Sequence, residues 1–113
     1  MIVVSDATPL NALIRIGHID VLALLFGEVI IPPSVASELS QAQTPEVVRS
    51  WLMAGPSWLE VRKPTAVDSS IAPDVGEQEA ICLAIELGAD LLLADDRGAR
   101  AAARRVGYRS PGL

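Results

Sequence analysis

The chain has 113 residues, half of them apolar, and a net charge of −5. This length suits one domain over residues 1–113 with a real hydrophobic core, and it is too short for two. No apolar run approaches the about 18 residues that a membrane span needs, and the N-terminus has no basic and apolar regions of a secretory signal, so we expect a cytoplasmic protein without a membrane.

The predicted elements alternate between strands and helices along the chain. In order we expect a strand at 2–5, helices at 8–17 and 18–26, a strand at 29–31, a helix from about Ser34, a helix from Thr44 to about Gly55, a short strand or edge segment at 58–61, a helix at 76–88, a strand at 90–94, a helix at 97–106 and a stub of strand at 108–109. Because helices alternate with strands and no hairpin signal occurs, we predict a three-layer α/β/α fold with a central parallel sheet.

Two features of the first half bear on a site. Thr8 followed by Pro9 is typical of a helix start, with a hydroxyl N-cap and proline at the first helical position. Further on, the spacing places Glu38 on the same helix face as Val35 and Leu39. A carboxylate among inward apolar residues is unusual and marks Glu38 as a candidate.

In the second half, residues 62–75 have the proline, serine and aspartate content of a loop. Gly76 then opens a strongly patterned helix whose first turn carries Glu77 and Glu79, where the helix dipole favours anions. Residues 90–94 form a continuous apolar run of the kind found in a central strand of a parallel sheet.

The predicted fold brings several acidic residues to one edge of the sheet. Sites in open parallel sheets form beyond the carboxyl ends of strands, where Asp6 and the pair Asp95-Asp96 lie. Glu38 and Glu77 lie on helices that could face the same edge. Oxygen ligands of this kind suit Mg²⁺ or Mn²⁺, and two such ions about 4 Å apart can clamp the attacking and leaving oxygens of a phosphodiester. We therefore expect a metal-dependent phosphodiesterase.

Each acid also has an ordinary structural interpretation. The alternatives are a turn residue at Asp6, a solvent-facing position at Glu38, simple dipole partners at Glu77 and Glu79, and a helix cap at Asp95 or Asp96.

The remaining chemistry of the chain is sparse. A negative net charge argues against nucleic acid, because phosphate contacts need lysine and arginine. The basic residues are unevenly spread, however, and five of the nine lie near the end: Arg97, Arg100, Arg104, Arg105 and Arg109. The single histidine, His18, is expected at the surface, and zinc ligands and a glycine-rich phosphate loop are absent. Cys82 has no basic neighbour and is interpreted as inert core filler.

Taken together, these positions resemble the PIN domain, and in particular PIN-like proteins similar to VapC toxins. The matching segments are residues 2–10 (IVVSDATPL), 29–39 (VIIPPSVASEL), 76–81 (GEQEAI) and 89–96 (ADLLLADD), with Arg100 after the last. Their order and spacing cover almost the whole chain.

The resemblance implies a metal-dependent ribonuclease that acts on RNA, usually as the toxin of a toxin–antitoxin pair and often as a homodimer. It implies as catalytic, metal-binding acids Asp6, Glu38, Glu77 and Asp95, with Glu79 as a rival for the third place and Asp96 as a rival or supplement for the fourth. In the implied reaction, water activated by Mg²⁺ attacks an RNA phosphodiester without a covalent enzyme intermediate. Similar proteins usually continue with a last strand and another helix, so the C-terminal end of the fold is expected to be shortened.

Two hypotheses from other classes remain. A catalytically weak or inactive PIN-like module would bind RNA or a partner protein without cleaving it, which the short C-terminus and the negative charge favour. Metal titration distinguishes the two, since metal should stabilise a fold that contains a carboxylate cluster. A phosphoryl-transfer enzyme with an aspartyl nucleophile is less favoured, because no second aspartate stands two residues after Asp6.

Overall fold

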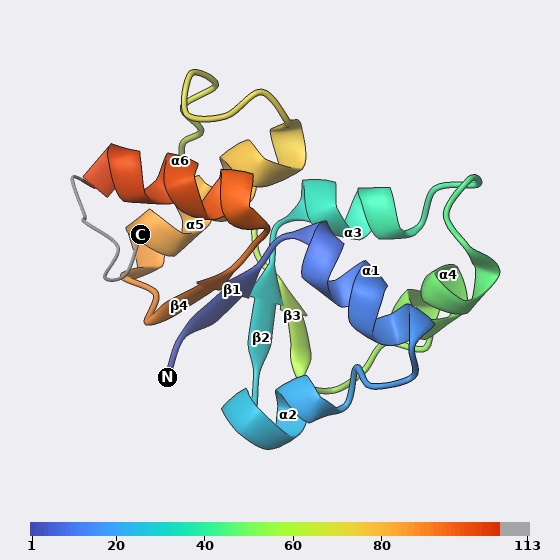
Figure 1. The fold of residues 1–113 in the computed structure, drawn as a ribbon. Coiled ribbons are helices and arrows are strands. Elements are labelled where there is room, and N and C mark those ends of the chain that lie inside the picture. Colours follow the sequence, from blue (N-terminus) through green and yellow to red (C-terminus); the bar gives the residue numbers. More distant parts are fainter. Residues whose placement is uncertain (107–113) are drawn as a thin grey trace.

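The computed structural model describes the backbone of residues 1–106 and the side chains of residues 1–95 and 97–102. Within this part, a four-stranded parallel sheet in the order β3-β2-β1-β4 lies among helices (Figure 1). The elements in chain order are β1 (Val3–Ser5), α1 (Ala7–Arg15), α2 (Val21–Phe26), β2 (Val29–Ile31), α3 (Pro33–Leu39), α4 (Glu46–Met53), β3 (Leu59–Val61), α5 (Val75–Leu87), β4 (Leu91–Leu93) and α6 (Asp96–Val106). The predicted α/β fold with a central parallel sheet is confirmed.

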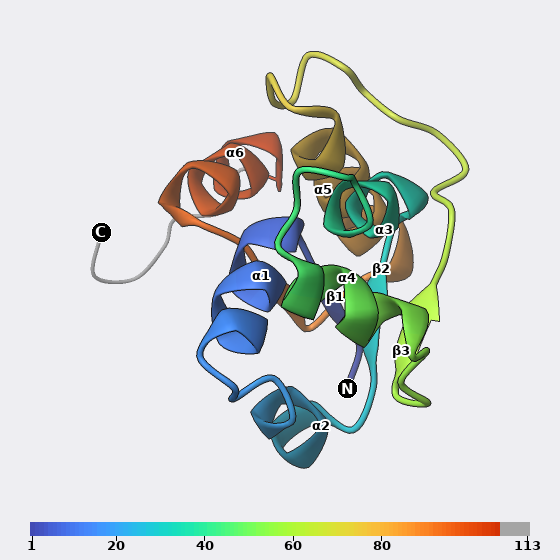
Figure 2. The same ribbon diagram turned by 90° about the vertical axis from the view of Figure 1, so that its right-hand side faces the viewer.

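Alternate residues of the two strands at one side of the sheet face opposite helical layers. Val3 belongs to a core cluster with residues of α1 to α4, and Leu91 and Leu93 pack against the same cluster. Val4 and Leu92 pack instead with α5. Because strand side chains alternate between faces, both faces are covered by helices, as parallel sheets require. Figure 2 shows α1 and α4 in front of the sheet, and the long connection from β3 to α5 passing around the outside.

One strand lies at the edge of the described sheet rather than in its middle. The apolar run at 90–94 predicts a central strand, but β4 lies at the edge of the described sheet, beside β1, and its three leucines are half-buried. The apolar composition of the run is explained by burial, because one face of β4 packs against the core cluster of α1 to α4 and the other face packs against α5. An apolar run cannot show whether a further strand pairs with the outer edge, so the prediction is tested only within the described sheet. The expected strand at 108–109 lies outside the described residues.

Two helix starts differ from the prediction, and both concern the site. Asp6, not Thr8, is the N-cap of α1, and its carboxylate accepts a hydrogen bond from the Ala7 N–H at 2.8 Å. Helix α5 begins one residue before Gly76, and Asp74 is its N-cap. Aspartate, serine and threonine all cap helices well, so adjacent candidates cannot be ranked without the backbone conformation.

Smaller differences concern α2 and α4. Both begin later than predicted, at Val21 and Glu46, because the residues before them form turns or extended backbone. None of the helices in the described part could span a membrane.

Candidate functional site

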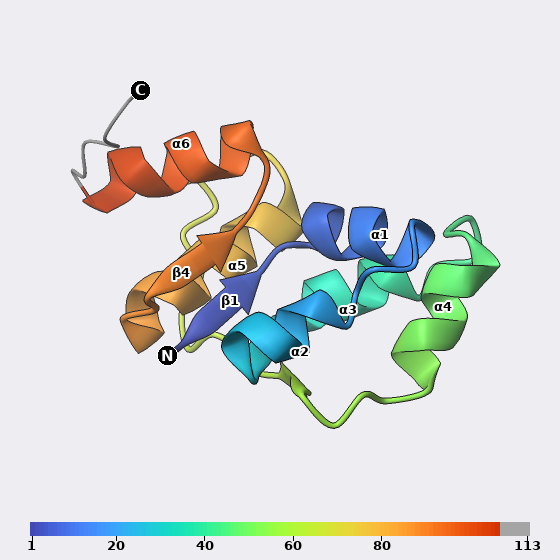
Figure 3. The ribbon, with the colours of Figure 1, turned by 60° about the horizontal axis from the view of Figure 1, so that its bottom comes forward.

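The carboxyl ends of β1 and β4 lie side by side, and the predicted acids Asp6 and Asp95 follow them closely in the sequence. Ser5 stands opposite Leu93 in the parallel register, and the Asp6 N–H donates to the Leu93 carbonyl oxygen at 2.9 Å. Asp95 follows, and its Oδ1 accepts a hydrogen bond from the Gly98 N–H at 2.8 Å, as an N-cap residue of α6 would. Figure 3 shows β4 running directly into α6 at this end of β1. The strand register therefore brings Asp6 and Asp95 to one edge of the sheet.

The start of α5 brings two further acids to Asp6. Gly76 is buried, and a Cβ atom at this position would lie 3.1 Å from Asp74 Oδ1, 3.5 Å from Asp6 Oδ1 and 3.7 Å from Glu38 Oε1. Oxygen atoms from three distant segments thus surround one small volume. A side chain at position 76 would fill part of this volume, so the glycine keeps it open.

Glu77 carries the clearest sign of a missing partner. Its side chain is only 4 % exposed, and Oε1 accepts a hydrogen bond from Arg97 Nη2 at 2.8 Å. Oε2 is buried and has no hydrogen-bond partner among the described residues. A buried carboxylate oxygen without a partner is costly, and a bound cation would satisfy it.

The acids raise one another's affinity for protons. Burial raises the pKa of Asp6 above its ordinary 3.8, and the charges of Glu77, Asp74 and Asp95 raise it further, against the Ala7 N–H bond, which lowers it. This is the behaviour expected when several carboxylates share a partly dehydrated site.

Glu38 has a raised pKa as well, first through loss of hydration and then through the charges of Asp74, Asp6 and Glu77. Glu38 is exposed as a whole residue. The exposure corrects the prediction that Glu38 lies among inward residues: Val35 and Leu39 are buried, and Glu38 borders that face.

Helix N-termini offset part of this repulsion. Asp6, Asp74 and Asp95 each accept a hydrogen bond from the first turn of a helix, in α1, α5 and α6 respectively. The positive end of a helix dipole stabilises a nearby carboxylate, so three helix starts meeting at one place can hold acids that would otherwise repel one another. This explains how the sequence can place five acids here and still fold.

These residues offer the oxygen donors that a hard divalent cation prefers, but the donors do not yet converge on one point. Oxygen donors surround Gly76, and Glu77 Oε2 has no partner among the residues that the structure describes. Yet no three acidic, histidine or cysteine side chains in the described part already converge closely enough to hold a metal ion. Arg97 holds one oxygen of Glu77, and like charges keep the others apart, so side chains must move for the donors to close on one ion.

A comparison with known protein families matches residues 2–113 to the PIN domain. The chain belongs to the PIN domain family. PIN domains are commonly nucleases and typically use divalent metal ions. A search of curated proteins found no match. The parallel α/β sheet flanked by helices agrees with a PIN domain.

The PIN domain brings together four of the six predicted site residues: Asp6, Glu38, Glu77 and Asp95. Glu79 has a different contact, since its Oε1 accepts a hydrogen bond from the Ser34 N–H at the start of α3, at 3.1 Å. The geometry therefore favours Glu77 over Glu79 as a member of the cluster. The side chain of Asp96 lies outside the described residues. Metal binding by these acids stays a prediction.

Two members of the cluster were not predicted from the sequence. Asp74 lies in a stretch with the composition of a loop. The one sequence feature that could have identified it is its position three residues before Glu77, which is the spacing between an N-cap residue and an acid in the first turn of a helix. Arg97 lies in the first turn of α6, and its side chain is 64 % exposed, but its guanidinium contacts Glu77. No pattern in the sequence shows that contact.

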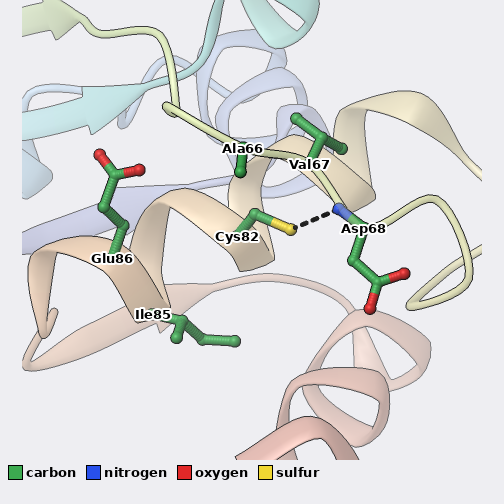
Figure 4. Close-up of a pocket in the computed structure, with 6 residues that line it drawn as sticks. All are labelled: Ala66, Val67, Asp68, Cys82, Ile85 and Glu86. Carbon is green, nitrogen blue, oxygen red and sulfur yellow. Dashed lines mark hydrogen bonds between the residues drawn. The ribbon is translucent and has the colours of Figure 1, made fainter.

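A pocket lies further along α5 (Figure 4). It is lined by Ala66, Val67, Asp68, Cys82, Ile85 and Glu86. Cys82, predicted as core filler, is half-buried here, and its Sγ accepts a hydrogen bond from the Asp68 N–H at 3.3 Å. Glu86 accepts one from the Thr65 N–H at 2.8 Å. These contacts fasten the β3–α5 connection to α5, so we assign this hollow a structural role.

Proposed function

We propose that this PIN domain is a Mg²⁺- or Mn²⁺-dependent endoribonuclease and the toxin of a toxin–antitoxin pair. The family and the resemblance to VapC-like proteins support this class of reaction. The single observation that carries the proposal is the meeting of carboxylates around Gly76, next to a buried Glu77 oxygen that has no partner in the described part.

Four side chains would hold the ion or ions: Asp6, Glu38, Glu77 and Asp95. A bound divalent ion supplies a more acidic attacking water and neutralises charge on the phosphate. Asp6 offers an oxygen on a rigid support, since its backbone N–H is bonded to Leu93 and its carboxylate caps α1. Glu77 offers Oε2. Glu38 is exposed at the rim, so its longer side chain can move to complete the site.

Asp74 has a supporting role in this scheme. Its Oδ1 accepts the Glu77 N–H at 3.1 Å, which fixes the first turn of α5 and with it the direction of the Glu77 side chain. Its charge adds to the field that would attract a cation.

RNA binding should depend on the divalent ion. The chain has a net charge of −5, and a cluster of unneutralised carboxylates repels phosphate. Ions in the cluster would reverse the local sign and allow the scissile phosphate to approach.

A protein partner is part of the proposal. Apolar side chains are exposed on α2 and α4: Leu24, Leu25, Val47 and Met53. We propose that an antitoxin or a second copy of the chain covers these side chains. We propose the cytoplasm as the location, in keeping with a single cysteine that forms no internal disulfide.

The test is cleavage of a random-sequence RNA pool by purified protein with Mg²⁺, with Mn²⁺ and with a chelator. We expect metal-dependent cleavage that Asp6→Asn reduces at least about a hundredfold, the scale on which electrostatic catalytic groups act. Asp20→Asn, the same change at an exposed helix start, should keep full activity. Folded wild-type protein that cleaves no RNA with either metal would refute the proposal.

A non-catalytic binding module is the second candidate. Two observations favour it: no three donors in the described part are already arranged for a metal, and Arg97 neutralises Glu77. RNA binding without cleavage, and without a requirement for divalent ions, would support this candidate.

A further inference from the structure

We propose that Arg97 is a built-in counter-ion that holds Glu77 while the site lacks metal, and that a divalent cation displaces it. The inference rests on the proposed function in one respect, because it assumes that the acidic cluster binds a cation. Arg97 is not one of the proposed metal-binding acids, and its proposed role is to compete with the metal for Glu77.

The contact is asymmetric. Arg97 Nη2 lies 2.8 Å from Glu77 Oε1, and the arginine side chain is 64 % exposed whereas the glutamate is 4 % exposed. The guanidinium therefore reaches from the surface toward a carboxylate that is almost fully buried. An exposed arginine can leave such a contact and regain hydration, so the bond can exchange.

Arg97 also lies in the field of the whole cluster. The hydrogen bond and the charge of Glu77 raise its pKa, and the charges of Asp95 and Asp74 raise it further. Arg100 lies one turn later on α6, is exposed and forms no ion pair among the described residues. Among the described residues, the cluster thus forms an ion pair with the first of these two arginines and none with the second.

The sign of the effect follows from linkage. A group that stabilises the metal-free state more than the metal-bound state must weaken metal binding by the same free energy. Arg97 neutralises Glu77 only while the glutamate is free, and once a divalent ion is present the guanidinium repels it. Loss of Arg97 should therefore destabilise the metal-free protein and tighten metal binding.

Metal affinity measured by titration calorimetry with MnCl₂ tests this directly. We expect Arg97→Gln to bind Mn²⁺ about five- to tenfold more tightly than wild type, the size given by a monovalent and a divalent charge about 6 Å apart in largely aqueous surroundings. Its melting temperature without metal should fall. Arg100→Gln removes the same charge from the same helix and should leave both values near those of wild type, and Arg97→Lys, which keeps the charge, should remain close to wild type in affinity.

A second measurement is made on the wild-type protein and uses a variant only to assign one resonance. In the wild-type protein, the side-chain Nε–H resonance of Arg97, assigned by its loss in Arg97→Lys, should shift as MgCl₂ is added, whereas that of Arg100 should not. Unchanged or weaker Mn²⁺ binding by Arg97→Gln while wild type binds Mn²⁺ would overturn the inference and leave the proposed function standing. An Arg97 resonance that ignores Mg²⁺ at saturation would overturn it too. If wild type binds neither ion, the metal-dependent function fails together with it.

Discussion

Replacement of Asp6 by asparagine should make the metal-free protein more stable while it abolishes metal binding. Asp6 is 5 % exposed and lies with other carboxylates at the start of α5. Asparagine has nearly the same shape and caps helices as well as aspartate does, so the hydrogen bond from the Ala7 N–H can remain. The substitution therefore removes a buried charge and little else.

The expected gain follows from the repulsion that is removed. Two unit charges about 5 Å apart repel each other by roughly 1 kcal/mol in water and about 3 kcal/mol at the effective dielectric constant near a protein surface. We therefore expect Asp6→Asn to raise the free energy of unfolding by about 1 to 3 kcal/mol at pH 8. In a domain of this size each kcal/mol moves the melting temperature by about 4 to 8 °C.

Thermal unfolding with and without MnCl₂ provides the assay. A ligand at a thousand times its dissociation constant stabilises a protein by about 4.1 kcal/mol, which exceeds the expected gain of Asp6→Asn, so wild type should gain this stability from Mn²⁺ and Asp6→Asn should not. The order of the two proteins should thus reverse when metal is added. Asp20→Asn changes an exposed helix start without a side-chain cap bond and should shift stability by less than about 0.5 kcal/mol. If Asp6→Asn melts below wild type without metal, Asp6 is needed for its charge in the fold itself and the reasoning is wrong.

Three further predictions concern the same cluster. The pKa values of Asp6 and Glu38 in the folded protein are raised above their ordinary 3.8 and 4.5, so the folded protein holds these protons more tightly than the unfolded chain does. This contribution to stability is lost as the pH rises through the folded-state pKa values. Unfolding measured without metal from pH 4 upward should show that loss, and saturating Mn²⁺ should cancel it. Glu77→Gln should abolish the calorimetric signal of Mn²⁺ binding, whereas Glu79→Gln should keep it, since Glu79 bonds α3; equal losses in both variants would refute the separation of the two glutamates. Gly76→Ala gains up to about 1 kcal/mol of helix propensity but places a methyl group among three carboxylates. Mn²⁺ affinity should therefore fall about tenfold or more, with little loss of stability. Unchanged affinity would show that the volume beside Gly76 is not the site.

Much of the fold is predictable because local rules decide it. The alternation of apolar strands with amphipathic helices permits a parallel sheet and little else, and the buried residues Val3, Val4 and Leu10 follow from it. The exact helix starts do not follow, because Asp6 and Thr8 are both good caps and the choice depends on where the backbone leaves the strand. The position of β4 at the edge of the described sheet depends on which strands pair, and pairing is a contact between distant segments.

The sequence by itself determined the kind of chemistry available to this protein: carboxylates after strands and at helix starts, little else that is reactive, and a family pattern over nearly the whole chain. Only the tertiary structure decided which acids meet. Glu77 and Glu79 are equivalent in a local pattern, yet one enters the cluster and the other bonds α3, because successive positions of a helix point in different directions. Asp74 and Arg97 join for the same reason, since a charge interacts with whatever the packing of α5 and α6 brings within a few ångström, and sequence spacing does not encode that distance.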